Sequence, residues 1–239
     1  FQGRAQVTDI AAILFDKDGT LFDFRQTWSQ WTADLIQDLA GERAEALGQA
    51  IGFDVASGEH HPDSPVIAST LDEWIDLMLP VLPERTYDDL LAEVRDRSAL
   101  ATQIPAAPLR PLLSDLQSAG YPLGVATNDG FAPVTRQLKD AGIHDLFTFV
   151  AGYDSGFGAK PGPGMLLGFA AHIGLPPGRI AMIGDSTHDM EAARAAGLRQ
   201  VAVLTGHATE RDLSPHAEVV LPSIADLPDW LAGAAKPTT

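Results

Sequence analysis

Short apolar runs recur along the chain, and amphipathic stretches separate them. Within each run the apolar residues are consecutive, which is typical of strands buried on both faces of a parallel sheet. The runs predict strands at residues 11–15, 121–126, 147–151, 180–184, 200–204 and 218–221. Because such a sheet needs cover on both faces, helices are expected between the runs.

The stretches between the later runs have the apolar spacing of helices, and a glycine follows each of them. A glycine just past a helix suits the left-handed conformation that residues with a Cβ adopt only at a cost. The predicted helices cover residues 109–118, 133–141, 163–173 and 187–196. This alternation predicts the α/β class, with a Rossmann-like parallel sheet core and helices on both faces.

The stretch from residue 23 to residue 105 differs, because it contains amphipathic helices and no convincing strand. We therefore predict an all-helical cap domain, residues 23–105, inserted into an α/β catalytic core made of residues 4–22 and 106–239. Its helices are expected at residues 26–39 and 42–51, from residue 70 onwards and over 86–101. The chain crosses twice between the two parts, which predicts a hinge. Residues 1–3 (Phe-Gln-Gly) resemble the remnant of an expression tag.

The charge balance narrows the choice of partners. Among 239 residues, 32 are acidic and 16 are basic, which gives a formal net charge of −16. A protein with this negative charge is repelled by the phosphates of nucleic acids and by anionic membrane surfaces, so neither is an expected partner. With 45% hydrophobic residues the chain can bury a core, which excludes disorder throughout.

Cysteine is absent, which excludes disulfides, thiolate metal sites and a cysteine nucleophile. No apolar run approaches the ~18 residues that a membrane span needs. No signal peptide is visible at the start of the chain, so the cytoplasm is the expected compartment. The sequence makes no prediction of the oligomeric state.

The strongest chemical signal is Asp16-Lys17-Asp18-Gly19-Thr20, directly after the first predicted strand. Carboxylates at i and i+2 leave an extended strand end on the same side, and Gly19 permits a sharp turn after them. Parallel α/β sheets bind ligands outside the carboxyl ends of their strands. Because Asp residues also cap ordinary strand-end loops, the other strand ends decide between the two readings.

Polar side chains follow the other predicted strands in the same way. Thr127 and Asn128 come after one strand, Lys160 stands in a glycine-rich loop, and Asp185 and Asp189 follow a third strand. Alone, each is an ordinary turn, loop lysine or helix cap. Brought to one sheet edge, they supply carboxylates, hydrogen-bond donors and an ammonium, which suits a hard cation together with a phosphate.

In this order the motifs resemble those of the haloacid dehalogenase-like hydrolase superfamily, in its phosphatase branch. The residues that carry the resemblance are Asp16-Lys17-Asp18-Gly19-Thr20, Thr127, Lys160-Pro161 and Gly184-Asp185-Ser186 with Asp189. The resemblance covers nearly the whole chain, and the helical insert matches the family's cap. Members similar to phosphoglycolate phosphatases look closest. Asp18 favours phosphate chemistry, since the dehalogenases of the superfamily lack this second aspartate.

The residue types and the resemblance imply a Mg²⁺-dependent phosphomonoester hydrolase. Asp16 is the expected nucleophile, which forms an aspartyl-phosphate. Asp18 is expected to protonate the leaving oxygen and then to activate water. Mg²⁺ is expected to bind Asp16, the backbone carbonyl of Asp18 and Asp185, because it prefers oxygen ligands.

The remaining motif residues are expected to bind the phosphoryl group. Lys160 would hold it and stabilise charge in the transition state. Thr127 and the backbone N–H of Asn128 would donate hydrogen bonds to the phosphoryl oxygens. Asp189 would stay outside the set of metal ligands and orient Lys160 or a metal-bound water.

The expected substrate is a small phosphorylated metabolite similar to phosphoglycolate, with nucleoside monophosphates and sugar phosphates as alternatives. A phosphomutase and a phospho-acceptor switch are further alternatives. Receiver-type switches also use strand-end aspartates, a threonine and a lysine, but Asp18 and a solvent-excluding insert favour turnover. A phosphonatase would need a Schiff-base lysine in the insert, and no lysine lies between residues 24 and 105.

Leaving-group selection is expected to come from the insert, since the core motifs contact only the phosphoryl group. Its longest polar break, residues 58–65, is of the loop type that presents side chains for recognition. We expect this loop, through His60, His61 and Ser64, or the adjoining helix starts, to reach the leaving group. The tryptophans of the insert are interpreted as packing or cap–core contacts: Trp28, Trp31 and Trp74.

Overall fold

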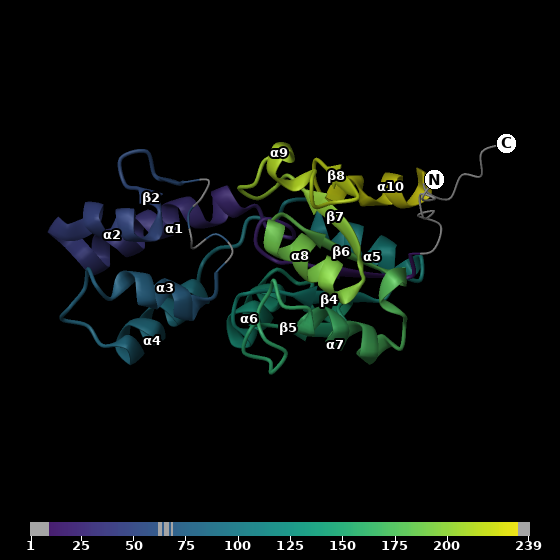
Figure 1. The fold of residues 1–239 in the computed structure, drawn as a ribbon, viewed down its shortest axis with the longest axis horizontal. Coiled ribbons are helices and arrows are strands. Elements are labelled where there is room, and N and C mark those ends of the chain that lie inside the picture. Colours follow the sequence, from purple (N-terminus) through teal and green to yellow (C-terminus); the bar gives the residue numbers. More distant parts are fainter. Residues whose placement is uncertain (1–9, 62–63, 65–66, 68, 234–239) are drawn as a thin grey trace.

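The computed structural model describes residues 10–61, 64, 67 and 69–233, so the predicted tag remnant at residues 1–3 lies outside it. A parallel sheet forms its centre, with the strand order β5-β4-β1-β6-β7-β8 (Figure 1). The strands are β1 (Ala12–Phe15), β4 (Leu123–Ala126), β5 (Phe149–Ala151), β6 (Ile180–Gly184), β7 (Arg199–Val203) and β8 (Val219–Leu221). Every strand that the sequence predicts is present.

Helices cover both faces of the sheet because its strands are apolar on both sides. In β1, Ile13 and Phe15 belong to one buried hydrophobic cluster, whereas Ala12 and Leu14 belong to another. The first cluster takes in α5 (Leu109–Ser118), α6 (Phe131–Asp140) and α10 (Leu227–Gly233), and the second α7 (Gly164–Ile173) and α8 (Thr187–Ala196). The predicted Rossmann-like core is therefore confirmed.

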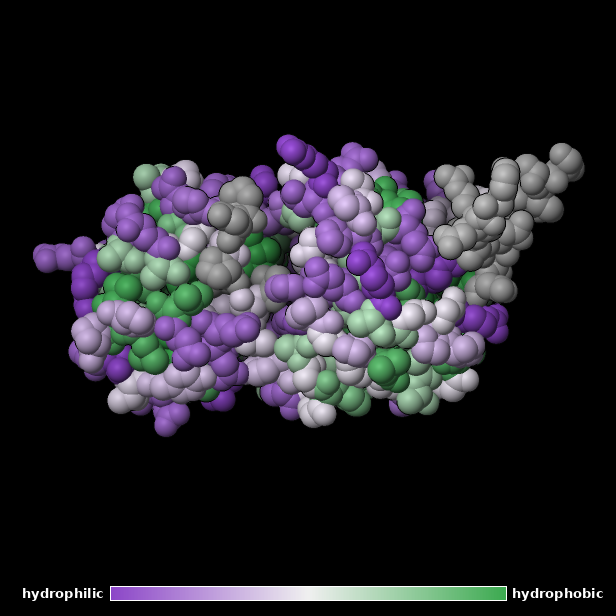
Figure 2. Space-filling model, in the orientation of Figure 1, coloured by the Kyte–Doolittle hydropathy of each residue, from purple (hydrophilic) through white to green (hydrophobic). Residues whose placement is uncertain are grey.

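The chain between β1 and α5 forms a second group of helices beside the sheet (Figure 1). These are α1 (Phe24–Ala40), α2 (Ala44–Ile51), α3 (Leu71–Met78) and α4 (Tyr87–Ser98). They bury a hydrophobic cluster of their own, which includes Leu35, Leu47 and Leu90. Figure 2 shows this insert and the core as two lobes. The exact bounds of cap and core, at residues 23–105 and on either side, stay a prediction.

The expectation of an all-helical insert needs one correction. The strands β2 (Phe53–Asp54) and β3 (Glu59–His60) pair in an antiparallel ribbon after α2. A strand of two residues is too short to show an alternating pattern, so no pattern in the sequence predicts this ribbon. The ribbon matters because it carries His60 away from solvent, as described below.

The two crossings between core and insert run side by side. The N–H of Asp23 donates to the carbonyl of Ile104 at 2.8 Å, and the N–H of Ala106 donates to the carbonyl of Leu21 at 3.0 Å. The insert is thus joined to the core at one place, directly after the Asp16–Thr20 loop.

Several short elements were not predicted, and none of them carries a motif residue. They are α9 (Glu210–Leu213), α10, and the 3₁₀ turns η3 (His144–Leu146), η4 (Pro177–Arg179) and η5 (Ile224–Asp226), whereas the 3₁₀ turn η2 (Gly41–Arg43) falls at the start of the helix predicted at residues 42–51. Across the described parts of the chain, no helix has both the length and the apolar character to cross a bilayer.

Candidate active site

The strand-end motifs meet at the carboxyl edge of the sheet, where the insert adjoins the core. One cavity brings together most of the predicted site residues: Asp16, Asp18, Thr127, Asn128, Lys160 and Asp185. Asp189 is not part of the cavity wall. It is fully buried beside the cavity, in the first turn of α8.

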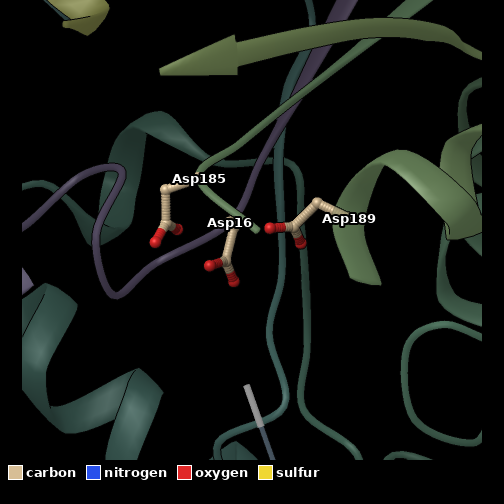
Figure 3. A group of neighbouring side chains, drawn as sticks. All are labelled: Asp16, Asp185 and Asp189. Carbon is tan, nitrogen blue, oxygen red and sulfur yellow. The ribbon is translucent and has the colours of Figure 1, made fainter. Parts of the chain in front are cut away.

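Three carboxylates form the centre of the site. Asp16, Asp185 and Asp189 each offer an oxygen within 4.8 Å of the others, and Figure 3 shows them gathered around the end of β1. Burial raises the pKa of Asp16 to about 7 and the pKa of Asp185 well above its ordinary value. So much buried negative charge calls for cations, and a carboxylate cluster of this kind suits a divalent ion.

Lys160 supplies part of that positive charge. Its Nζ lies 2.7 Å from Oδ1 of Asp16 and 2.6 Å from Oδ1 of Asp189. Burial by itself would lower the pKa of Lys160, but these two carboxylates raise it overall, so the ammonium stays charged. The contact expected between Asp189 and Lys160 is thus present. The same Asp189 accepts from the Ser186 hydroxyl at 2.6 Å, which fixes it at the start of α8.

Two glycines make room for Asp185. A Cβ on Gly19 would lie 2.2 Å from the Asp185 carboxylate, and one on Gly206 would lie 1.7 Å from it. Gly19 also has a φ of +76°, a conformation that side chains rarely adopt. The Thr20 hydroxyl donates to Asp185 at 3.2 Å. Gly19 was singled out in the sequence for its turn, whereas Gly206 follows β7 in an ordinary-looking loop and was missed.

Asp18 is held apart from the carboxylate cluster. Its Oδ1 accepts a hydrogen bond from Nε1 of Trp28 at 2.8 Å, and its Oδ2 lies 2.9 Å from Nζ of Lys17. Burial raises the pKa of Asp18, while the adjacent Lys17 acts to lower it. Trp28 belongs to α1 of the insert, so one side chain from the insert touches the predicted acid of the core.

Lys17 is a site residue that the sequence analysis missed. It is fully buried, and its Nζ lies 3.0 Å from Asp129 and 2.5 Å from Oε1 of Gln137, in addition to its contact with Asp18. Burial acts to lower the pKa of Lys17, but the two carboxylates raise it overall. A lysine between two aspartates usually lies on a surface loop, and the sequence alone does not show that strands surround this one.

Asn128 holds Lys160 through its side chain. Its Oδ1 accepts from the N–H of Lys160 at 2.8 Å, and its Nδ2 donates to the carbonyl of Lys160 at 2.9 Å. This clamp explains how loops after two different strands keep one geometry, and the sequence did not indicate it. The neighbouring Thr127 accepts from the N–H of Asp129 at 3.1 Å and lines the cavity.

The expectation that the loop at 58–65 reaches the leaving group through His60 and Ser64 is wrong. His60 is 4% exposed on β3, where its ring packs edge-on against Phe53. Ser64 is buried, and its hydroxyl donates to the carbonyl of Ile51 at 2.6 Å. Neither belongs to the cavity wall, and nor does the exposed His61. Residues 62, 63 and 65 lie outside the described part of the chain.

Instead, helices α1, α3 and α4 of the insert form the far wall of the cavity. Their contribution is mainly aromatic and aliphatic, and with the adjoining loop it comprises Phe24, Trp28, Trp31, Ile67, Ser69, Leu71, Trp74, Val94 and Ser98. Because Leu71 begins α3, the alternative expectation, that a helix start reaches the cavity, agrees with the structure. The tryptophans were interpreted as packing or cap–core contacts; the hydrogen bond from Trp28 to Asp18 confirms a cap–core contact, and all three rings also line the cavity, which that interpretation did not include.

The comparisons with known proteins agree with this site. A family model for haloacid dehalogenase-like hydrolases matches residues 10–197. A phosphoglycolate phosphatase from Chromobacterium violaceum is 31% identical over 229 residues, which cover 93% of this chain and 96% of that protein. One from Neisseria meningitidis is 28% identical over 97% of this chain and 93% of that protein.

Solved structures show the same fold. The crystal structure of CbbY from Rhodobacter sphaeroides in complex with phosphate matches with a TM-score of 0.68 and 21% identity, over 91% of this chain and 96% of that chain. The chain therefore belongs to the haloacid dehalogenase-like hydrolases. Within that family it is a phosphatase, in the branch similar to phosphoglycolate phosphatases.

Proposed function

We propose that this protein is a Mg²⁺-dependent phosphomonoester hydrolase that acts on a small phosphorylated metabolite through an aspartyl-phosphate on Asp16. One observation carries the proposal: a buried carboxylate at a strand tip faces a cavity, beside a lysine that stays charged and a second carboxylate. A carboxylate in this setting is a nucleophile with a cationic phosphate-binding group next to it. The cytoplasm stays the predicted compartment.

The residues present fit a magnesium ion. Asp16 and Asp185 would hold it together with the backbone carbonyl of Asp18, and the two glycines around Asp185 leave that carboxylate free of bulky neighbours. Asp189 belongs to the same carboxylate group, and we assign it a positioning role because one of its oxygens holds Lys160 and the other accepts from the hydroxyl of Ser186. When bound, the ion offsets the repulsion between the Asp16 carboxylate and a phosphate dianion. At an effective dielectric constant of about 20, one pair of like unit charges ~4 Å apart repels by about 4 kcal/mol.

Besides that ion, the chemistry uses side chains that are already in place. An Asp16 oxygen bonds to phosphorus as the bond from phosphorus to the leaving oxygen breaks, and Asp18 donates a proton to that oxygen. Asp18 next accepts a proton from water, whose oxygen bonds to phosphorus and displaces the Asp16 carboxylate. Lys160 and Thr127 bind the phosphoryl oxygens during both steps, so that inorganic phosphate leaves and Asp16 is regenerated.

A Mg²⁺-dependent phosphate-release screen over phosphorylated metabolites tests this function. Phosphoglycolate is included because the relatives named above carry that name. We expect release that requires Mg²⁺ and that Ca²⁺ inhibits, since Ca²⁺ takes more ligands at longer distances and spoils the attack geometry. Asp185→Asn is expected to weaken Mg²⁺ binding, so that half-maximal activity requires a higher Mg²⁺ concentration. Full activity in excess chelator would contradict the proposal.

A further inference from the structure

The part of the cavity that the insert forms has aromatic walls. The rings of Trp28 and Trp31 meet edge to face, with centroids 5.1 Å apart and planes at 88°, and the ring of Trp74 lies 6.5 Å from Trp31. Leu71 and Val94 extend the same wall. Burying an apolar group against a surface of this kind is favourable, because apolar area is removed from water. An aromatic group adds further stabilisation when its ring packs against the rings of the wall.

The insert side chains of this wall carry no positive charge of their own, and the core ammonium of Lys17, 5.5 Å from the centroid of the Trp28 ring, is paired with Asp18 and Asp129. None of the wall's described insert residues is Lys, Arg or His, and the insert residues outside the described part, at positions 62, 63, 65, 66 and 68, are Pro, Asp, Pro, Val and Ala. Arginines of the insert pair with carboxylates elsewhere, as Arg43 does with Glu84 and Arg97 with Asp38. Basic side chains along the cavity come from the core, from Lys160 and His188.

A carboxylate on the leaving group would meet this wall without a cation to pair with. Burying an anion is costly unless it is paired or well hydrogen-bonded. Lys160 is already engaged by Asp16 and Asp189, at the phosphoryl end. His188 also belongs to the core, where it lies in the first turn of α8, directly before Asp189 in the sequence.

Resting on the phosphatase function proposed above, we propose that the enzyme prefers phosphomonoesters with an uncharged, apolar leaving group, above all an aromatic one, over esters whose leaving group carries a carboxylate. The insert selects for this class by packing Trp31, Trp74 and Leu71 against the leaving group. Phosphoglycolate, with its carboxylate one carbon from the ester oxygen, is then a poor substrate.

Benzyl phosphate and phosphoglycolate form a matched pair for the test. Both release a primary alcohol, and they differ in whether the adjacent group is a phenyl ring or a carboxylate. The phosphate-release screen described above first establishes that the enzyme is a phosphatase, and release from none of its phosphomonoesters would defeat the proposed function itself. Given that activity, we expect kcat/KM for benzyl phosphate to exceed that for phosphoglycolate at least tenfold, and any smaller ratio overturns the inference.

Variants of the wall separate recognition from a structural role. Trp74→Ala is expected to lower kcat/KM for benzyl phosphate at least tenfold and to change that for phosphoglycolate less than twofold. Leu71→Arg, which puts a cation into the wall, is expected to reverse the preference. Trp230→Ala is the matched control, since that tryptophan packs against the core cluster and is not part of the cavity wall.

Several outcomes would contradict the inference, and a second variant covers the case in which the first does not fold. If Trp74→Ala lowers kcat/KM equally for both substrates, with an unchanged thermal unfolding temperature, the Trp74 ring does not distinguish between the two leaving groups. If Trp74→Ala does not fold, the Leu71→Arg result decides alone. A preference for phosphoglycolate that disappears in His188→Ala would place carboxylate recognition on the core. A stronger preference for phosphocholine than for benzyl phosphate would make the rings a site for cations.

Discussion

Burial sets the chemistry of Asp16 at the scale of the single residue. The carboxylate is 8% exposed, and its pKa is raised to about 7, chiefly by loss of water and against the opposing effect of Lys160. Lys160 and a bound cation are what make the ionised form available as a nucleophile. Stability therefore favours the neutral form of this carboxyl group, whereas nucleophilic attack requires the ionised form. A substitution at Asp16 separates the two effects.

Asp16→Asn is expected to lower kcat by roughly a thousandfold or more. The amide is no nucleophile, and it removes one metal ligand. The free energy of unfolding without Mg²⁺ should stay unchanged or rise, because a desolvated charge is gone. Steady-state kinetics and urea unfolding measure the two effects, and near wild-type turnover in the purified variant would refute the assignment of the nucleophile.

Lys17 supports the site by neutralising two partly buried carboxylates, those of Asp18 and Asp129. Lys17→Met should destabilise the fold by about 3 kcal/mol, because both partners lose their buried cation. In Lys17→Met/Asp129→Asn, part of this loss should be recovered, since one stranded charge is removed. Urea unfolding at constant pH is the measurement. A loss below about 1 kcal/mol would show that water reaches the two carboxylates.

At the scale of elements, one aromatic contact joins β3 of the insert to the loop after β7. The ring of Phe24 packs edge-on against His60 and His207, with centroids 5.5 Å and 4.7 Å away. Burial lowers the pKa of His60 to about 3 and the pKa of His207 to about 4. His207 also feels Arg25, which lowers its pKa further, and Asp23, which raises it. Both imidazoles are therefore neutral in the folded protein near neutral pH.

These two histidines predict a loss of stability in acid. The contribution of the neutral histidines to the free energy of unfolding is complete above about pH 6.5. It declines as pH falls toward 4, because the unfolded chain binds protons that the folded chain does not. Each histidine contributes a slope of at most about 1.4 kcal/mol per pH unit.

The difference between wild type and His60→Phe/His207→Phe isolates this effect from the buried aspartates, whose raised pKa values act in the opposite direction. Urea unfolding from pH 7 to pH 4.5 should show a shallower acid decline in the double variant. His61→Gln is the control, since His61 is exposed and adjacent to His60. Parallel curves for wild type and the double variant would contradict the account of this contact.

At the scale of the whole molecule, the sheet and the core motifs were predictable because each depends on local sequence. An apolar run ending in Asp16 or Asp185 specifies both a buried strand and a polar strand end, and capping specifies where the next helix begins. The parallel topology then brings distant strand ends to one edge without further information.

What was not predictable depends on contacts between segments far apart in the chain. Lys17 is buried only because strands and α6 surround it, and Trp28 reaches Asp18 only because the insert folds back over the sheet edge. His60 looked like a loop residue, but a two-residue ribbon turns it inward. The identity of the cavity wall follows from how helices α1, α3 and α4 pack, which no local pattern records.

The covalent step is the centre of this account, and trapping it is the most direct test. The enzyme is mixed with Mg²⁺ and a rapidly hydrolysed phosphomonoester, quenched in acid during turnover, digested at low pH and examined by peptide mass spectrometry. We expect one phosphoryl group on the peptide that contains Asp16, located to that carboxylate, and none in Asp16→Asn. A phosphoryl group on another residue, or none at any quench time while phosphate is being released, would contradict the mechanism.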